Sequence, residues 1–288
     1  MLLRRIICLN SQFKNHLPRH ASSATSLVTI STCDKKQICR IKLNNPRQRN
    51  ILSLAMINDL IKAIEDNEQS SRVLVLTAGE QTVFSSGHSL KELFELSKTK
   101  ACGSIFDRCT ELMLKVRQLS IPVIAEVFGL AAAAGCQLVA SCDIVVAGEN
   151  ASFSVPGVKH GLFCITPAVA VRRSITNSKL SSLMLFTGEP ISAKEAFEHG
   201  LVSRVVGQND LERETNKIAQ QICANSRPVV ALGKKYLQLK DAKEDLLDDY
   251  QVATRGMLEN LDLKDTQHGL ESFIKKTRPT WTHKNDKI

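Results

Sequence analysis

The chain has 288 residues, of which 43% are hydrophobic and 23% are charged. This length suits one large domain with an appendage, and the apolar content excludes a wholly disordered protein. No uninterrupted apolar run reaches the roughly 18 residues that a membrane-spanning helix needs, so we expect no membrane span. Nine cysteines are scattered without a CxxC pair or a zinc-type His/Cys cluster, which predicts reduced thiols and no metal site.

The formal net charge of +9 is unevenly distributed along the chain. The first carboxylate is Asp34, and four cations precede it: Arg4, Arg5, Lys14 and Arg19. An N-terminus that is rich in Arg, Ser and Leu and lacks acids is typical of a mitochondrial presequence. We place this presequence at residues 1–25, which predicts a location in the mitochondrial matrix. A disordered basic tail is the alternative interpretation.

The residues from 26 onward alternate strand and helix patterns. Strands are expected at 27–32 and 38–43, joined by a polar turn at 34–36. The i, i+3, i+4, i+7 spacing of a helix buried on one face is present at Ile57, Leu60, Ile61 and Ile64. The next expected elements are a buried strand at 73–76, helices near 90–96 and 105–116, and a strand at 123–127.

The character of the sequence changes toward the C-terminus. Ser192 stands three residues before Glu195, which is the pattern of a helix capping box, and Gly200 is the expected end of that helix. A strand is expected at 201–206. From about Leu211 onward the chain is charged and helical in pattern. We therefore predict an α/β core at 26–226 and an all-helical C-terminal region at 227–288.

Two segments of small residues, 84–92 and 129–137, are expected to be loops that separate a strand from a helix. Glycine and alanine let backbone amides approach a ligand closely, and amides at a helix start carry positive partial charge. Two such loops that face each other can hold one developing oxyanion with two N–H donors. The alternative is that the small residues serve only tight helix packing.

Four segments, taken together, resemble the enoyl-CoA hydratase/isomerase, or crotonase, superfamily. They are FSSGHSLKEL at 84–93, IPVIAEVFGLAAAAGCQLVASCDI at 121–144, FTGEPISAKEAFEHGLVSRVV at 186–206 and GLESFIKKTR at 269–278. The resemblance extends over about residues 27–278 in the family's order and spacing. It implies an α/β fold built as a spiral of ββα turns, with a helical C-terminal region that assembles trimers, often paired into hexamers.

The resemblance also implies an oxyanion hole formed by the backbone N–H groups of His88 and Ala134. In the family these donors hold the carbonyl oxygen of an acyl-CoA thioester and stabilise the enolate that its reactions share. The family generally has a small residue where His88 stands and glycine where Ala134 stands. Only the amides are needed, so both differences are compatible with the same role.

Coenzyme A is expected as part of the substrate or ligand, with no tightly bound cofactor. By the same resemblance, its adenine pocket is lined by His88, Ser89, Leu90 and Lys91. Phe273 and Lys276 match C-terminal residues that complete this pocket, commonly from a neighbouring subunit. The expected assembly is therefore a homotrimer or a hexamer.

Two positions depart from the family's pattern. A hydratase uses one glutamate on the helix after the second loop and another in a PE-type loop further along. This chain has Gln137 at the first position and Gly157 at the second. Glutamine can hold a water molecule but cannot accept its proton at neutral pH, and glycine can do neither. A positioned acid or base contributes about 10²- to 10⁴-fold in rate, so efficient hydration and Δ3,Δ2-isomerisation are not expected.

Other residues are candidate substitutes for the missing carboxylates. His160 lies in the same loop as Gly157 and carries an imidazole, which titrates near neutral pH. Glu126 lies on the strand that enters the second loop, and strand alternation leaves the direction of its side chain open. Cys136 and Cys164 are candidate nucleophiles, although isolated cysteines beside apolar residues are usually inert.

Three functions remain open at this point. The first is an enzyme of fatty-acid metabolism that uses the oxyanion hole without a glutamate pair, with decarboxylase-like or weak lyase activity, because loss of CO₂ forms an enolate without a base. The second is a non-catalytic acyl-CoA-binding or regulatory subunit of lipid metabolism. The third is RNA binding, but adjacent lysines are few and aromatic residues for base stacking are scarce, so no nucleic-acid partner is expected.

Overall fold

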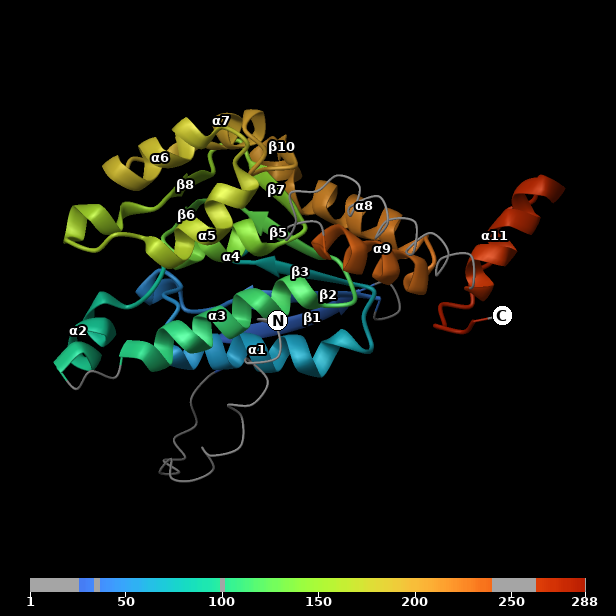
Figure 1. The fold of residues 1–288 in the computed structure, drawn as a ribbon, viewed down its shortest axis with the longest axis horizontal. Coiled ribbons are helices and arrows are strands. Elements are labelled where there is room, and N and C mark those ends of the chain that lie inside the picture. The colour runs from blue at the N-terminus through green and yellow to red at the C-terminus, as the bar shows by residue number, and fades with distance from the viewer. Residues whose placement is uncertain (1–25, 34–36, 99–101, 240–262, 288) are drawn as a thin grey trace, which may run out of the picture.

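The computed structural model describes residues 26–33, 37–98, 102–239 and 263–287 (Figure 1). The predicted presequence at 1–25 and the predicted turn at 34–36 lie outside the described residues. Within the described ranges, no helix is both long enough and apolar enough to cross a membrane. The seven cysteines whose side chains are described form no disulfide.

A six-stranded sheet forms the centre of the molecule, with the strand order β1-β2-β3-β5-β7-β10. β1 and β2 are antiparallel and the other neighbours are parallel. Every residue of β3 and β5 is buried, because helices cover both faces of the sheet, and this explains their unbroken apolar sequences. The strands are β1 (Val28–Cys33), β2 (Ile38–Leu43), β3 (Val73–Thr77), β5 (Val123–Val127), β7 (Ile144–Gly148) and β10 (Arg204–Val206).

Different helices pack on the two faces of this sheet. One face contacts α1 (Leu54–Glu68), which in turn packs against α3 (Cys102–Gln118), as Figure 1 shows. The periodic apolar residues of α1, from Ile57 to Ile64, are buried as predicted. The other face contacts α8 (Leu211–Cys223), where Ile124 and Val146 of the sheet form a smaller core with Leu211.

A second sheet of four short strands was not predicted. Its order is β4-β6-β8-β9, with β9 antiparallel to β8. The segments 84–92 and 129–137 were expected to be loops that separate a strand from a helix, but each contains a strand of this sheet near its start, so that part of the prediction is wrong. Three-residue strands are too short to show a period of two. The strands are β4 (Val83–Ser85), β6 (Leu130–Ala132), β8 (Ser152–Ser154) and β9 (Ile191–Ser192).

The predicted capping box is present at the start of α7 (Ala193–Glu198). Ser192 Oγ accepts from the Glu195 amide at 3.2 Å, and Glu195 Oε2 accepts from the Ser192 amide at 2.9 Å. The strand expected at 201–206 is wrong in its first half, because only Arg204–Val206 pairs with β7. Val202 is buried, but its amide donates to Ala196 O in the turn that ends α7.

The remaining helices surround the second sheet or follow the first. α2 (Leu90–Lys98) and α4 (Ala134–Ser141) follow β4 and β6 directly. The chain then forms α5 (Ile165–Ser174), α6 (Ser178–Thr187), α9 (Arg227–Leu239) and α11 (Lys264–Lys275), with single 3-10 turns η1 (Pro46–Gln48), η2 (Pro156–His160) and η3 (Gln208–Asp210). α9 begins at the residue where the predicted C-terminal region starts.

One buried ion pair attaches α9 to the core. Lys234 is only 5% exposed. Its Nζ atom lies 2.6 Å from Asp143 Oδ2 and also donates to the carbonyl oxygens of Val116 and Ile121. Asp143 Oδ2 also accepts from the Val123 amide at 2.7 Å. Burial lowers the pKa of Lys234, and Asp143 opposes that shift. This single ammonium group therefore joins α9 to the end of α3 and to the start of β5.

Replacing Lys234 with methionine should lower the free energy of unfolding by about 3 kcal/mol, because Asp143 and two carbonyl groups lose their common partner. Denaturant unfolding measures this change. The matched control is Lys217→Met on the exposed face of α8, whose Nζ lies 3.5 Å from Glu214, and it should change stability by less than about 0.5 kcal/mol. Equal effects of the two substitutions would contradict this role for Lys234.

Candidate active site

The two small-residue segments lie against each other because their strands pair. Val83 is opposite Leu130 and Ser85 is opposite Ala131. The contact is so close that side chains do not fit at the glycines. A Cβ atom at Gly135 would lie 2.6 Å from Ser85 O, and one at Gly87 would lie 2.7 Å from the Cβ of Ala133. The predicted facing of the two segments is therefore observed.

The first segment is fixed by hydrogen bonds to the chain just before α1. Ser85 Oγ donates to Asn50 O at 2.7 Å and accepts from the Gly87 amide at 3.2 Å. Gly87 O accepts from the Leu52 amide at 2.8 Å. The second segment is fixed from the other side, where the Ala133 amide donates to Ser154 O of β8 at 2.9 Å. Both segments are thus held by rigid neighbours.

Two unused backbone donors result from this arrangement. Within the part of the chain that the structure describes, neither the His88 amide nor the Ala134 amide donates a hydrogen bond. Ala134 is the first residue of α4, where amides have no partner inside the helix. The Ala134 nitrogen lies 3.0 Å from the place that a Cβ atom of Gly87 would take. The Ala134 amide therefore lies beside Gly87, the residue that precedes His88. Two donors to one oxygen atom must lie close together in this way.

Ala133 has a strained backbone at this point. Its φ is 50° and its ψ is −120°, a combination found at the first central residue of a type II′ turn and favoured only by glycine. Such a conformation costs a residue with a Cβ atom about 1–3 kcal/mol. The surrounding contacts hold Ala133 in it, and this conformation sets the direction of the Ala134 amide.

The sequence-based prediction assigned His88 to the oxyanion hole through its amide and to the lining of the adenine pocket, but it gave the imidazole no chemical role. Nδ1 lies 2.9 Å from Leu52 O, so it carries the proton, and the ring meets Phe106 edge-on with centroids 5.6 Å apart. Burial lowers the pKa of His88, and its hydrogen bond to Leu52 opposes that shift. The ring is therefore neutral, and Nε2 is a buried acceptor without a partner among the described residues.

Gln137 lies in the first turns of α4 and is only 6% exposed. Its Oε1 atom is buried and has no hydrogen-bond partner within the described residues. A buried polar atom of this kind costs free energy unless a water molecule or a ligand pairs with it. Gln137 therefore supplies an uncharged polar group, and no carboxylate, at the first of the two glutamate positions.

Gly157, at the second glutamate position, has no room for a side chain in this loop. A Cβ atom would lie 2.5 Å from Leu162 O and 2.8 Å from Cys164 Sγ. The Gly157 amide donates to the same sulfur at 3.3 Å. Position 157 therefore has neither a carboxylate nor the space that such a side chain would occupy.

The candidate substitutes for the glutamates are placed differently. His160 is exposed on η2. Glu126 is buried on the α8 side of β5, where Oε1 accepts from Arg40 at 2.5 Å and from Thr77 at 2.8 Å. This pairing makes it a structural residue. Burial raises the pKa of Cys136 to about 12 and also raises the pKa of Cys164, so both thiols stay protonated.

The residues predicted to hold coenzyme A lie at two ends of the molecule. Ser89 caps α2 by accepting from the Glu92 amide at 3.2 Å, and Leu90 and Lys91 are exposed on the first turn of that helix. Phe273 is a residue of α11, but its side chain lies outside the described residues, and Lys276 is exposed just after that helix. Figure 1 shows α2 and α11 at opposite ends of the long axis. A single chain does not bring the two groups together.

No group of three His, Cys, Asp or Glu side chains within the described ranges is placed to hold a metal ion.

Residues 34–284 match the enoyl-CoA hydratase/isomerase family. The chain belongs to this family. Proteins named "Enoyl-CoA hydratase domain-containing protein 3, mitochondrial" are similar to it. The one from Xenopus laevis is 52% identical over 97% of this chain and 93% of its own length. The one from Homo sapiens is 47% identical over 85% of this chain and 81% of its own length.

Solved structures of the enoyl-CoA hydratase/isomerase family agree with the fold. The crystal structure of the human domain-containing protein 3 has a TM-score of 0.84 at 45% identity and covers 88% of this chain and 100% of that chain. An enoyl-CoA hydratase from Mycobacterium smegmatis has a TM-score of 0.83 at 37% identity, over 88% of this chain and 98% of that chain. The predicted family resemblance and the crotonase-type α/β fold are therefore confirmed.

The strain at Ala133 predicts an unusual stabilising substitution. Ala133→Gly should raise the free energy of unfolding by about 1 kcal/mol, because glycine adopts a positive φ without steric cost. Ala132→Gly, one residue earlier in β6, is the matched control and should lower it by about 0.5–1 kcal/mol. Thermal or denaturant unfolding of both variants measures the difference. A loss of stability at both positions would contradict the strain at Ala133.

Proposed function

We propose that this member of the enoyl-CoA hydratase/isomerase family binds acyl-CoA thioesters in mitochondria and acts in fatty-acid metabolism through a stabilised thioester enolate. The observation that carries the proposal is the pair of unused amides at His88 and Ala134 on two rigidly packed loops. Backbone donors that are fixed in advance stabilise a developing oxyanion without reorganisation during the reaction. Relatives named as enoyl-CoA hydratases support the choice of a thioester ligand.

The groups around these amides argue against efficient hydration. Hydration needs one group that takes a proton from water and another that delivers a proton to carbon. Gln137 does neither at neutral pH. Gly157 has no side chain that could do so, and its surroundings leave no room for a longer one. Glu126, which sequence alone left open, is paired with Arg40 on the other face of the sheet. Neither of the family's two glutamate positions therefore carries a charged side chain in this chain.

Decarboxylation is the reaction that suits such a site best. In a thioester with a carboxylate on its α-carbon, the C–C bond to that carboxylate breaks and CO₂ leaves. The electron pair passes into the thioester and forms the enolate, whose oxygen the two amides hold. A proton from solvent then completes the α-carbon. No step requires a carboxylate of the protein. A weak lyase activity that passes through the same enolate is also compatible with the two amides.

A non-catalytic acyl-CoA-binding or regulatory subunit is the second candidate function. The crowding at Gly157 favours it, since the space for the second proton-transfer group is filled by Leu162 O and Cys164 Sγ. Binding of the thioester at the amides then persists without turnover. Turnover measurements with α-carboxylated esters distinguish the two candidates.

The proposed coenzyme A pocket requires more than one copy of the chain. Its first part is formed by residues 88–91 at the start of α2, and the matching C-terminal residues, Phe273 and Lys276, lie at the other end of the same molecule (Figure 1). A neighbouring copy is therefore needed to supply α11. This need supports a homotrimer, or a hexamer of two trimers, as the functional assembly, and a location in the mitochondrial matrix follows from the predicted presequence.

The proposal is tested with protein that lacks residues 1–25. Calorimetry with butyryl-CoA should show micromolar binding, and a panel of malonyl-, methylmalonyl- and crotonyl-CoA should show turnover only of the α-carboxylated esters. Ala134→Pro, which removes one amide donor, should reduce that turnover by about 10²- to 10³-fold. Ala134→Ser keeps the amide and is the matched control. Binding without any turnover would favour the regulatory subunit, and absence of binding would contradict both candidates.

Gln137→Glu gives a sharper test of the missing proton transfer. Glutamate has nearly the same shape as glutamine, so it fits the buried position, and it should raise crotonyl-CoA hydration about 10²-fold over the wild type. Gly157→Glu should give no gain, because its side chain collides with Leu162 and Cys164. A wild-type protein that hydrates crotonyl-CoA as fast as Gln137→Glu would contradict this account of the site.

A further inference from the structure

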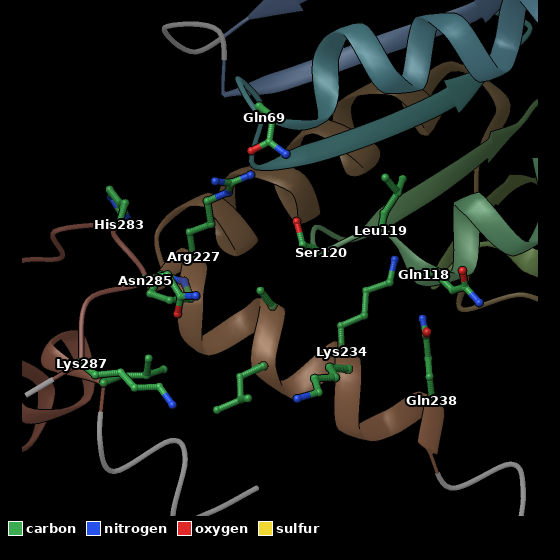
Figure 2. A pocket seen from close by; sticks show the side chains of 15 residues that line it. Gln69, Gln118, Leu119, Ser120, Arg227, Lys234, Gln238, His283, Asn285 and Lys287 are labelled. Carbon is green, nitrogen blue, oxygen red and sulfur yellow. The ribbon is translucent and has the colours of Figure 1, made fainter. Parts of the chain in front are cut away.

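A cavity of about 890 Å³ lies between α9, the ends of α1 and α3, and the tail that follows α11 (Figure 2). We refer to it as the C-terminal cavity. Its walls include Gln69, residues 118–120, Arg227 and the tail residues His283, Asn285 and Lys287. None of its lining residues belongs to the segments 84–92 and 129–137 of the candidate active site. Its volume is within the range of small-molecule sites.

The tail that forms one wall is firmly attached. Asp265 of α11 is fully buried and accepts hydrogen bonds from Ser226 Oγ at 2.7 Å, from the Thr282 amide at 2.8 Å and from the His283 amide at 3.1 Å. Trp281 Nε1 donates to Ala224 O at 2.7 Å. These bonds hold the tail against the turn between α8 and α9. The cavity therefore has a defined wall on this side.

Among the described residues, the charged side chains that line the cavity have one sign. Cations come from α9 and from the tail, and no carboxylate is present among the described residues that line the cavity. Lys234 is neutralised by Asp143, so it is not counted as a ligand group. Arg227 at the start of α9 and Lys287 on the tail remain as the cations on which the argument depends. A lining of this kind favours an anion.

Two buried N–H groups in the lining have no acceptor. Arg72 Nη1 lies 3.3 Å from His283 Nε2, and because arginine only donates, Nε2 is the acceptor and the proton is on Nδ1. His283 Nδ1 and Arg227 Nε are both buried without a partner within the described residues. Leaving such donors unsatisfied is unfavourable, so an acceptor from a ligand would stabilise both.

Uncharged groups complete the lining. Gln118 and Gln238 approach each other from α3 and α9, while Arg227 extends toward Gln69 on another side of the cavity (Figure 2). Pro228, Ala231 and Leu232 provide an apolar strip along α9. Such a lining is suited to a ligand with one anionic end and a neutral ring or chain.

We propose that the C-terminal cavity binds a small organic phosphate. The phosphate group accepts from Arg227 and from His283 Nδ1, and Lys287 on the tail adds positive charge to the lining. The neutral part of the ligand lies on the apolar strip of α9 and takes hydrogen bonds from the side-chain amides around it. The bound phosphate also links the tail to α9, so the ligand strengthens the attachment of the C-terminal segment to the core.

The test is calorimetry on the full chain with ADP, inorganic phosphate and adenosine as probes. ADP should bind at micromolar concentration and adenosine at least about 30-fold more weakly, since a charge-assisted hydrogen bond is worth roughly 1.5–3 kcal/mol. Arg227→Gln and Lys287→Gln should each weaken ADP binding about tenfold or more. Lys284→Gln carries the same charge change on the same tail outside the cavity, and it should stay within about twofold of the wild type.

Three results would overturn the proposal. They are ADP affinity unchanged in both lining variants, adenosine binding as tightly as ADP, and loss of ADP binding in Lys91→Gln with full binding in Lys287→Gln. The last result would place the nucleotide at α2. If Arg227→Gln does not fold, the comparison of Lys287→Gln with Lys284→Gln decides alone. None of these three outcomes depends on whether the protein turns over a thioester.

Discussion

The structure depends on one close contact, that between the segment after β4 and the segment around the start of α4. Gly87 lies against Ala133 and Ala134, and Gly135 lies against Ser85, at distances that exclude any larger residue at the glycines. This contact sets the direction of two backbone amides and holds Ala133 in a conformation that alanine rarely adopts. The larger sheet positions this contact, because β3, β5 and β7 lead directly into β4, β6 and β8 of the second sheet.

The chemistry of the site follows from what stands beside the two amides. Family members that hydrate a double bond need two carboxylates, and this chain has an amide at one position and a filled space at the other. His88 adds a neutral imidazole whose Nε2 atom is a buried acceptor without a partner in the described part of the chain. In the function proposed for this chain, the two amides stabilise negative charge on a thioester oxygen, and neither glutamate position supplies a group that moves protons to and from water.

Much of the fold could be predicted from the sequence, for reasons that differ between elements. The unbroken apolar runs of β3 and β5 and the periodic face of α1 are local signals, and all three elements are where the patterns place them. The strands of the second sheet have three residues or fewer, so no periodic signal exists. Val202 was assigned to a strand because it is apolar, but its burial results from the turn after α7.

The sequence predicted which types of residue make up the candidate site, but not how their side chains are arranged. The two loops and the absence of glutamates at positions 137 and 157 are visible in the sequence. The crowding at Gly157 depends on Leu162 O and Cys164 Sγ folding back onto it, and the direction of Glu126 depends on its pairing with Arg40. Both are contacts through space. The C-terminal cavity likewise depends on a tail that returns to the turn between α8 and α9.

The most direct measurement of the central claim is the carbonyl stretching frequency of butyryl-CoA, labelled with ¹³C at the thioester carbon, when bound to the protein. Two amide donors on one oxygen polarise the carbonyl bond. The account predicts a lower frequency in the bound ester than in water, and a smaller displacement in Ala134→Pro than in Ala134→Ser. A bound ester whose carbonyl frequency equals that in water would contradict the assignment of these amides as its oxygen site.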